Sequence, residues 1–204
     1  VRSSSAFRSA SDFRESQGSE RYLRICRRLV VLPEPLLLRT LRAPYDYGGA
    51  YSTTAAEASL DADAVRALVS AIDYAKGLHT IRLVGLRRGS TPLLSKDSLI
   101  GLVRAVQSAK AISTLDLSDD ALDDAIAAQQ LQALLAQSNG VSSLVLAHNA
   151  LGVDSGKMML AALEGNKVLR CLDVSCNPRL AEWPSMAKDL ERMVKTNHTL
   201  SGLT

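Results

Sequence analysis

The amino-acid sequence predicts an α/β fold in which similar units, each a short strand, a loop and an amphipathic helix, stack into an elongated array. The first observation is that ISTLDLSDDAL at 112–122 and VSSLVLAHNAL at 141–151 are two copies of one eleven-residue phrase. The second is that the segments between such phrases carry apolar residues at three- and four-residue spacing, as amphipathic helices do. One unit of this size cannot bury its apolar face alone, so stacked neighbours must share a core.

Composition and charge exclude several classes of protein. The 204 residues are 47% hydrophobic and 22% charged, which is ordinary for a folded, soluble chain. The 24 Lys and Arg residues are interspersed with 21 Asp and Glu residues, so no basic surface for nucleic acid or lipid is indicated. Aromatic residues make up 4%, too few for base stacking, and no apolar run is long enough to span a bilayer. We therefore expect neither direct nucleic-acid binding nor membrane insertion.

The three cysteines, Cys26, Cys171 and Cys176, are odd in number and form no CxxC pair. This spacing disfavours a zinc site and a disulfide framework, so we expect no metal, no cofactor and a reducing, cytoplasmic compartment. The first residue is Val1 rather than Met, and we expect the natural chain to begin upstream of it.

The N-terminal third is the least regular part of the sequence. Residues 1–19 are rich in Ser and Arg and are predicted to be a flexible arm; a transit peptide is the alternative, disfavoured by the acids Asp12 and Glu15. Residues 20–77 are predicted to be degenerate repeats or a cap. Helical periodicity begins at Glu20 and stops before Pro33.

Two further features fall within residues 20–77. PLLLRTLRA at 35–43 is predicted to be a degenerate strand, and residues 43–54 are predicted to be a loop. Tyr45, Tyr47 and Tyr51 in that loop either pack over the end of the array, which we favour, or form a second binding site. Residues 60–75 are predicted to be a helix that ends near Gly77.

Residues 78–204 carry the repeats. Copies of the phrase LxxLxLxxNxL begin at Leu78, Ile112, Val141 and Leu169, and a fifth copy begins at Leu200 and breaks off at Thr204. The starts lie 34, 29, 28 and 31 residues apart, so the period is steady. We therefore expect either that the chain continues beyond Thr204 or that a partner covers a truncated last repeat. Helices are predicted over residues 96–108, 125–137, 155–164 and 185–195.

The alternation of a strand gives each position of the phrase a direction. Positions four and six, as in Leu115 and Leu117, should point into the core, and positions three, five and seven should lie on the open face. The ninth position holds Asp120, Asn149 and Asn177, whose side chains can bond to loop backbone groups. In the first repeat the ninth position is Leu86, which lacks such a polar side chain, so we expect the array to be irregular there.

The phrases resemble leucine-rich repeats, and the period with a full helix per unit is similar to the ribonuclease-inhibitor-like subfamily. The resemblance covers residues 78–204 well and 20–77 only as degenerate units. It implies a leucine-rich-repeat solenoid with a curved parallel sheet on the concave face and helices on the convex face. It also implies an intracellular protein.

The open face suggests a role in binding other proteins. Its aligned positions are small and polar, and Arg82 and Arg170 are expected to pair with Asp116 and Asp173 across the strands. We predict a non-enzymatic protein-protein interaction scaffold, a structural or adaptor subunit of a larger assembly in the cytoplasm, with cytoskeletal or organellar assemblies as candidates. The residues predicted to contact the partner are Arg82, Asp116, Ser118, Asp119, Val145, His148, Arg170, Asp173 and Ser175.

The residues also allow two enzyme-related alternatives. The eighth position reads Gly85, Asp119, His148 and Cys176, so an acid, an imidazole and a thiol stand in the order of a cysteine hydrolase. A regulator of small GTPases, acting as a GTPase-activating protein, would use an arginine such as Arg82, Arg87 or Arg88. No P-loop, HExxH or GxSxG is present, so the sequence predicts no catalytic residues.

Overall fold

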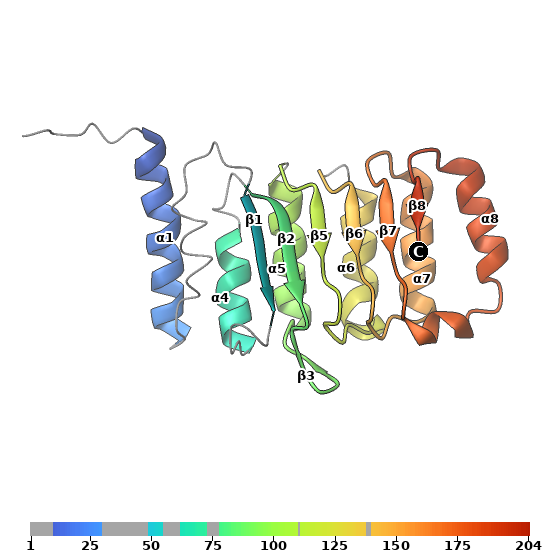
Figure 1. Ribbon diagram of the computed structural model, residues 1–204, viewed down its shortest axis with the longest axis horizontal. Coiled ribbons are helices and arrows are strands. Elements are labelled where there is room, and N and C mark those ends of the chain that lie inside the picture. Colours follow the sequence, from blue (N-terminus) through green and yellow to red (C-terminus); the bar gives the residue numbers. More distant parts are fainter. Residues whose placement is uncertain (1–9, 30–48, 55–61, 73–77, 110, 138–139) are drawn as a thin grey trace, which may run out of the picture.

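The computed structural model describes residues 10–29, 49–54, 62–72, 78–109, 111–137 and 140–204. Its main body is one parallel sheet of six strands in the order β1, β2, β5, β6, β7, β8, with helices α4 to α7 on one side of it (Figure 1). The elements are α1 (Ala10–Leu29), β1 (Gly49–Thr54), α4 (Ala62–Ile72), β2 (Leu78–Val84), β3 (Arg87–Arg88), β4 (Thr91–Pro92), α5 (Lys96–Ser108), β5 (Thr114–Asp116), α6 (Asp124–Ala136), β6 (Ser143–Val145), α7 (Val153–Gly165), β7 (Cys171–Asp173), the 3-10 helix η1 (Pro178–Glu182), α8 (Met186–Thr196) and β8 (Gly202–Leu203).

The prediction of a leucine-rich-repeat solenoid is confirmed by this arrangement. A helix lies between each two successive strands of the sheet, preceded after β2 by the β3–β4 hairpin and after β7 by η1, so strands that follow one another in the sequence are also neighbours in the sheet. The pairing of Leu115 with Ile81 and with Leu144 repeats the predicted register of the phrases. Helix α5 has the predicted bounds, and α6, α7 and α8 begin and end within two residues of theirs.

The core lies between the sheet and the helices. The fourth and sixth positions of the phrase are buried to 0% exposure at Ile81, Leu83, Leu115 and Leu117, and equally at the corresponding leucines of the third repeat. Helices α5 to α7 contribute the facing leucines, and the buried apolar residues of the sheet and helices form one core cluster. The alternation predicted from the sequence therefore matches the packing.

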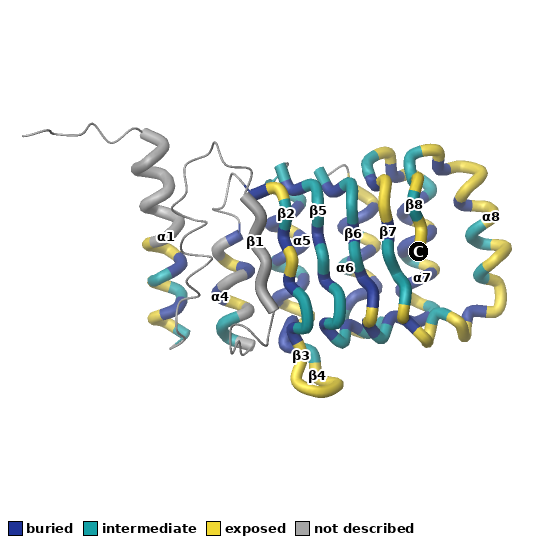
Figure 2. Tube along the Cα trace, viewed as in Figure 1, coloured by how far each residue is buried: buried dark blue, intermediate teal, exposed yellow. Residues whose placement is uncertain are grey.

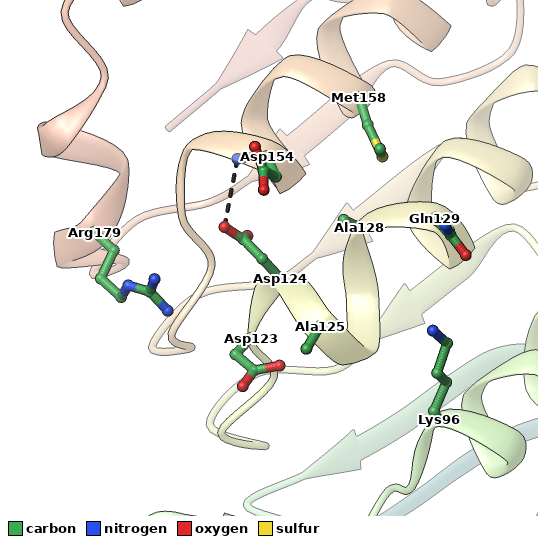
Figure 3. Close-up of a pocket in the computed structure, with 9 residues that line it drawn as sticks. All are labelled: Lys96, Asp123, Asp124, Ala125, Ala128, Gln129, Asp154, Met158 and Arg179. Atoms are coloured by element: carbon green, nitrogen blue, oxygen red, sulfur yellow. Dashed lines mark hydrogen bonds between the residues drawn. The ribbon is translucent and has the colours of Figure 1, made fainter.

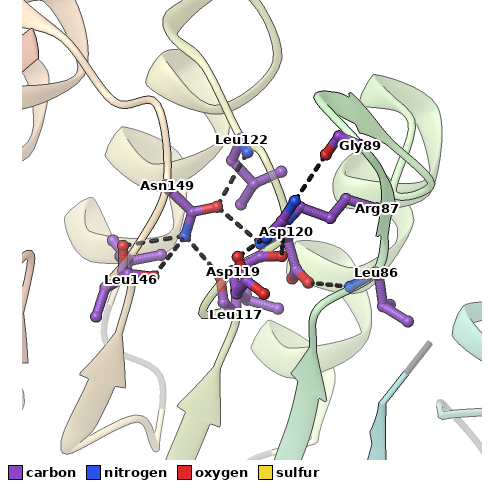
Figure 4. Close-up of polar contacts among 10 residues, drawn as sticks. Leu86, Arg87, Gly89, Leu117, Asp119, Asp120, Leu122, Leu146 and Asn149 are labelled. Carbon is purple, nitrogen blue, oxygen red and sulfur yellow. Dashed lines mark hydrogen bonds and ion pairs between the residues drawn. The ribbon is translucent and has the colours of Figure 1, made fainter. Parts of the chain in front are cut away.

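A ladder of ninth-position side chains runs along the ends of the strands. Asn149 accepts hydrogen bonds at Oδ1 from the amides of Asp120 and Leu122, both at 3.0 Å, and its Nδ2 donates to the carbonyls of Leu117 and Leu146 at 2.8 and 3.0 Å (Figure 4). Asn177 repeats the pattern one unit later. These bonds satisfy backbone groups that the ends of the strands leave unpaired.

Asp120 departs from this ladder because a carboxylate cannot donate. Its Oδ1 accepts a hydrogen bond from the Leu86 amide at 2.7 Å, while Oδ2 is buried without a hydrogen-bond partner among the described residues. Burial, with the nearby carboxylates of Asp116 and Asp119, raises the pKa of Asp120 to about 8. The raised pKa favours the uncharged form of Asp120 at pH 7, yet Oδ2 makes neither of the hydrogen bonds that Nδ2 of Asn149 donates to the carbonyls of Leu117 and Leu146.

The N-terminal part differs from the prediction at two places. Helix α1 begins at Ala10, so residues 10–19 are helical rather than part of a flexible arm. Residues 49–54 are not a loop but strand β1, which pairs in parallel with β2. The predicted strand at 35–43 lies outside the described residues.

The first repeat carries the expected irregularity as a hairpin. Strands β3 and β4 pair antiparallel around a turn at Gly89, and the hairpin extends beyond the end of the sheet (Figure 1). Leu86 itself is fully buried and bonded to Asp120, so the irregularity begins after this position.

No described helix is long and apolar enough to cross a membrane. No group of three or more His, Cys, Asp or Glu side chains in the described ranges is placed to hold a metal ion. The three cysteines are free thiols, with Cys26 buried and the other two exposed.

Candidate functional site

The open face of the sheet brings four of the predicted contact residues into one row. Arg82 pairs in register with Asp116, Asp116 with Val145, and Val145 with Asp173. Arg82 is exposed and the other three are half-buried. No described helix covers this side of the sheet, so the row faces solvent (Figures 1 and 2).

Two of these acids are held by a serine two residues further on. Asp116 Oδ1 accepts hydrogen bonds from the Ser118 amide at 3.1 Å and from its hydroxyl at 2.6 Å. Asp173 Oδ1 accepts one from the Ser175 amide at 2.9 Å. Ser118 and Ser175 therefore lie next to the row, at the carboxyl ends of β5 and β7.

Asp173 is a charged group at neutral pH. Burial raises the pKa of this carboxyl, but hydrogen bonds from Ser175 and Thr204 and the nearby His148 outweigh burial and hold the pKa below its ordinary value. His148 is thus close enough to act electrostatically on the row, although it follows β6 rather than belonging to it.

The expected ion pairs across the strands are wrong. Neither Arg82 nor Arg170 has an acidic side chain within 4.0 Å among the described residues. Asp116 and Asp173 bond to their own serines instead, because a partner two residues away costs less ordering than a long arginine on another strand. Arg170 also lies just before β7, at the end of the sheet opposite Ser175, so it is separate from the cluster.

The eighth-position residues have a structural reason to be unusual. Gly85, Asp119, His148 and Cys176 all have positive φ, between 55° and 70°. In this conformation the amides of Gly85, Asp119 and His148 each donate to a seventh-position carbonyl in the next repeat, at 3.0 Å. Gly, Asp and His tolerate this left-handed conformation better than most residues, so the turn accounts for much of the pattern.

The eighth-position row does not form the contacts of a hydrolase. Asp119 Oδ1 binds the Nε of Arg87 at 2.7 Å, and the same Nε donates to the Asp119 carbonyl at 3.1 Å (Figure 4). No hydrogen bond joins Asp119 to His148, or His148 to Cys176, in the described part of the chain, and both of the latter side chains are exposed. In a cysteine hydrolase a carboxylate orients the catalytic histidine, but here the carboxylate of Asp119 is bound to Arg87 and not to His148.

These contacts also bear on the arginines considered for a GTPase regulator. Arg87 is held by Asp119 and by the Gly89 carbonyl, at 2.8 Å from Nη1, so it is not available to reach a phosphate without leaving them. Arg82 and Arg88 are exposed.

The tyrosines cannot be placed as a second site. Tyr45 and Tyr47 lie outside the described residues, and Tyr51 is known only as a backbone position in β1.

A cavity that the sequence did not indicate lies at the N-terminal ends of α5, α6 and α7. Its volume is about 710 Å³, and it is lined by Lys96, Asp123, Asp124, Ala125, Ala128, Gln129, Asp154, Met158 and Arg179 (Figure 3). Only a comparison of where three helices begin reveals it, because its residues are scattered over more than 80 positions.

One of the three carboxylates that line this cavity, Asp124, already has a structural role. Asp124 accepts hydrogen bonds from the amides of Gly152, Ser155 and Asp154, at 2.8, 3.1 and 3.4 Å. Burial raises its pKa, but these donors, with Ser155 foremost, hold the pKa of Asp124 below its ordinary value. Asp124 thus caps the start of α7, whose own N-cap is a glycine without a capping side chain.

Comparisons with known proteins show the fold. No protein-family description and no curated protein sequence matches the chain. The tropomodulin C-terminal domain of Caenorhabditis elegans matches with a TM-score of 0.57 at 17% identity, covering 71% of this chain and 81% of that one. The structure named leiomodin-1 actin-binding site 2 matches with a TM-score of 0.54 at 17% identity, covering 69% and 76%.

These matches correct the subfamily inferred from the sequence. The assignment to ribonuclease-inhibitor-like repeats is wrong, because the solved structures that resemble the chain are tropomodulin and leiomodin domains. The repeat period and the full helix in each unit led to that assignment, whereas the structural matches cover 71% and 69% of the chain. The leucine-rich-repeat architecture is the one these domains share with this chain.

Proposed function

We propose that this chain is a non-enzymatic protein-protein interaction scaffold that binds its partner on the open face of the sheet. The observation that carries the proposal is the in-register row of Arg82, Asp116, Val145 and Asp173 on a surface that no described helix covers. The row offers both signs of charge around an apolar centre, and its acids are fixed by Ser118 and Ser175. Such fixed polar groups lose little side-chain freedom when a partner binds.

The partner that we propose first is actin, within a larger intracellular assembly in which the chain is a structural or adaptor subunit. The support is the likeness of fold to a domain named for actin binding. Actin as the partner also agrees with the sequence-based prediction, which named cytoskeletal assemblies among the candidates.

Co-sedimentation with actin filaments tests this proposal. We expect the wild-type chain to pellet with filaments and a variant with Arg82→Ala, His148→Ala and Asp173→Ala to stay in the supernatant. A matched control replaces three exposed residues on the helices of the convex side and should pellet like wild type. Its substitutions are Arg104→Ala, Gln132→Ala and Lys157→Ala. Equal pelleting of both triple variants would place the contact elsewhere, and no pelleting of wild type would exclude actin.

The GTPase alternative gives a different result in a simple assay. Of the three arginines considered for a GTPase-activating protein, Arg87 is bound to Asp119, whereas Arg82 and Arg88 are exposed. A non-enzymatic scaffold should not accelerate GTP hydrolysis by small GTPases, and an acceleration that is lost in Arg82→Ala or Arg88→Ala would favour the alternative.

A further inference from the structure

The hairpin that follows the first repeat carries an exposed serine at its tip. Arg87 pairs with Pro92 and Arg88 with Thr91, which leaves Gly89 and Ser90 as the turn. Gly89 has a φ of +59° and open space around it, and both turn residues are exposed. Ser90 is exposed, and its hydroxyl has no hydrogen-bond partner within the described ranges. The hairpin that carries it projects beyond the end of the sheet (Figure 1).

The residues before Ser90 form a recognisable charge pattern. RRGS at 87–90 is the one place in the sequence where two adjacent arginines stand three and two residues before a serine. Many serine kinases select substrates by basic residues at these positions, because acidic pockets beside the active site bind the guanidinium groups. Arg88 is exposed and has no ion pair among the described residues, so it can enter such a pocket without breaking a contact.

We propose that Ser90 is a phosphorylation site, and that the phosphate draws Arg87 away from Asp119. In the reaction, a kinase transfers the terminal phosphoryl group of ATP to Ser90 Oγ. The new P–O bond forms as the bond to the bridging oxygen of ADP breaks, and the hydroxyl proton passes to the aspartate base of the kinase.

The position of Arg87 is the reason for the second half of the proposal. Its guanidinium already spans from the turn, where Nη1 donates to the Gly89 carbonyl at 2.8 Å, to Asp119 Oδ1 at 2.7 Å. Ser90 is the next residue after Gly89, so a phosphate on Ser90 would be attached one residue from the carbonyl that this guanidinium already contacts. A phosphoserine carries about −1.5 to −2 charges and three acceptor oxygens, against one charge on the Asp119 carboxylate.

The transfer of Arg87 would change the edge of the open face. Asp119 would lose its ion pair, and the hairpin would lose a side-chain link to the second repeat. Since Asp119 is one of the predicted contact residues, the modification is suited to regulation of that surface. Neither phosphorylation nor the transfer of Arg87 depends on the identity of the partner.

The modification is tested on the complete chain with magnesium ATP and the catalytic subunit of a cyclic-AMP-dependent protein kinase. We expect mass spectrometry of peptides to place one phosphate on Ser90 and none there in Ser90→Ala. Arg88→Ala should slow the reaction at Ser90 at least tenfold, while Arg104→Ala, an exposed arginine on α5, should not change it. Absence of phosphate at Ser90, or an equal rate without Arg88, would overturn the assignment.

The transfer of Arg87 has its own readout in the NMR signal of its Nε–H group. In the unmodified chain, Asp119→Ala should shift this signal, because Asp119 Oδ1 is its acceptor. In the phosphorylated chain, the signal should already be displaced, and Asp119→Ala should then move it little. If Asp119→Ala shifted the signal equally in both forms, Arg87 would remain with Asp119 and this part of the proposal would be wrong.

Discussion

Replacement of Asp120 by Asn should stabilise the protein, because it supplies the donor that the ladder lacks at this position. Asn149 and Asn177 each donate through Nδ2 to sixth-position carbonyls of their own and the preceding repeat. By the same register, an Asn at position 120 would donate to the carbonyls of Leu117 and Leu83. Its Oδ1 would keep the hydrogen bond from the Leu86 amide.

The magnitude follows from the pKa of Asp120. The pKa of Asp120 is about 8 in the folded chain against an ordinary value of 3.8, so between these pH values the unfolded state loses the proton while the folded state keeps it. At pH 7 the difference corresponds to about 4 kcal/mol of lost stability, at about 1.36 kcal/mol per pH unit. Asn carries no such penalty, so we expect the free energy of unfolding at pH 7 to rise by roughly 2 to 4 kcal/mol.

The sign of the pH dependence gives a second check. Because the folded-state pKa is raised, the contribution of Asp120 to stability is fully present below pH 3.8, falls between pH 3.8 and about 8, and is constant above that. Urea unfolding of wild type and Asp120→Asn at several pH values should therefore show a gap that widens from pH 4 to pH 8.

A matched control and a clear contrary result complete this experiment. Asp97 is an exposed acid in the first turn of α5, and Asp97→Asn should change the free energy of unfolding by no more than about 0.5 kcal/mol at any pH. A lower free energy of unfolding for Asp120→Asn than for wild type at pH 7 would refute the raised pKa of Asp120. A difference in free energy of unfolding that did not change with pH would refute it as well.

Three further substitutions test the packing of the repeats. Asp124→Ala should lower the free energy of unfolding by about 1 to 2 kcal/mol in urea at pH 7, and this loss should disappear as acid protonates wild-type Asp124 below its depressed pKa. Gly156→Ala should shift the fluorescence of Trp183, the single tryptophan, to longer wavelength, because the added carbon would lie 2.7 Å from its ring; Gly165→Ala, with open space around it, should not. Asn149→Ala should cost about 3 kcal/mol or more in thermal or urea unfolding, because it leaves several buried backbone groups unpaired, and a loss below about 1 kcal/mol would contradict the ladder.

The regular half of the fold could be predicted because its signals repeat. The phrases at 112–122 and 141–151 assign each residue to the core or the open face, and the buried leucines follow that assignment. The helices could be predicted because their apolar residues recur at helical spacing, and these residues are the ones buried against the sheet. Residues 10–19 were misread because their serines suggest disorder, whereas their remaining residues, such as Ala10 and Glu15, favour helix.

The candidate site could be predicted in outline but not in its contacts. The register of the phrases correctly aligned Arg82 with Asp116 and Val145 with Asp173. The sequence could not show that each acid bonds to a serine of its own repeat, because local and cross-strand partners differ by small free energies. The sequence also did not indicate the ion pair between Arg87 of the hairpin and Asp119, because these residues lie 32 positions apart in the chain.

A photo-crosslinking experiment tests most directly the claim that the partner binds the open face of the sheet. A photo-reactive amino acid is placed at Val145, in the middle of the row, or at Gln132, exposed on α6, and each variant is irradiated with purified actin filaments. The proposal predicts a crosslink to actin from position 145 and none from position 132. A crosslink from position 132 alone, or none from position 145 at saturating actin, would contradict it.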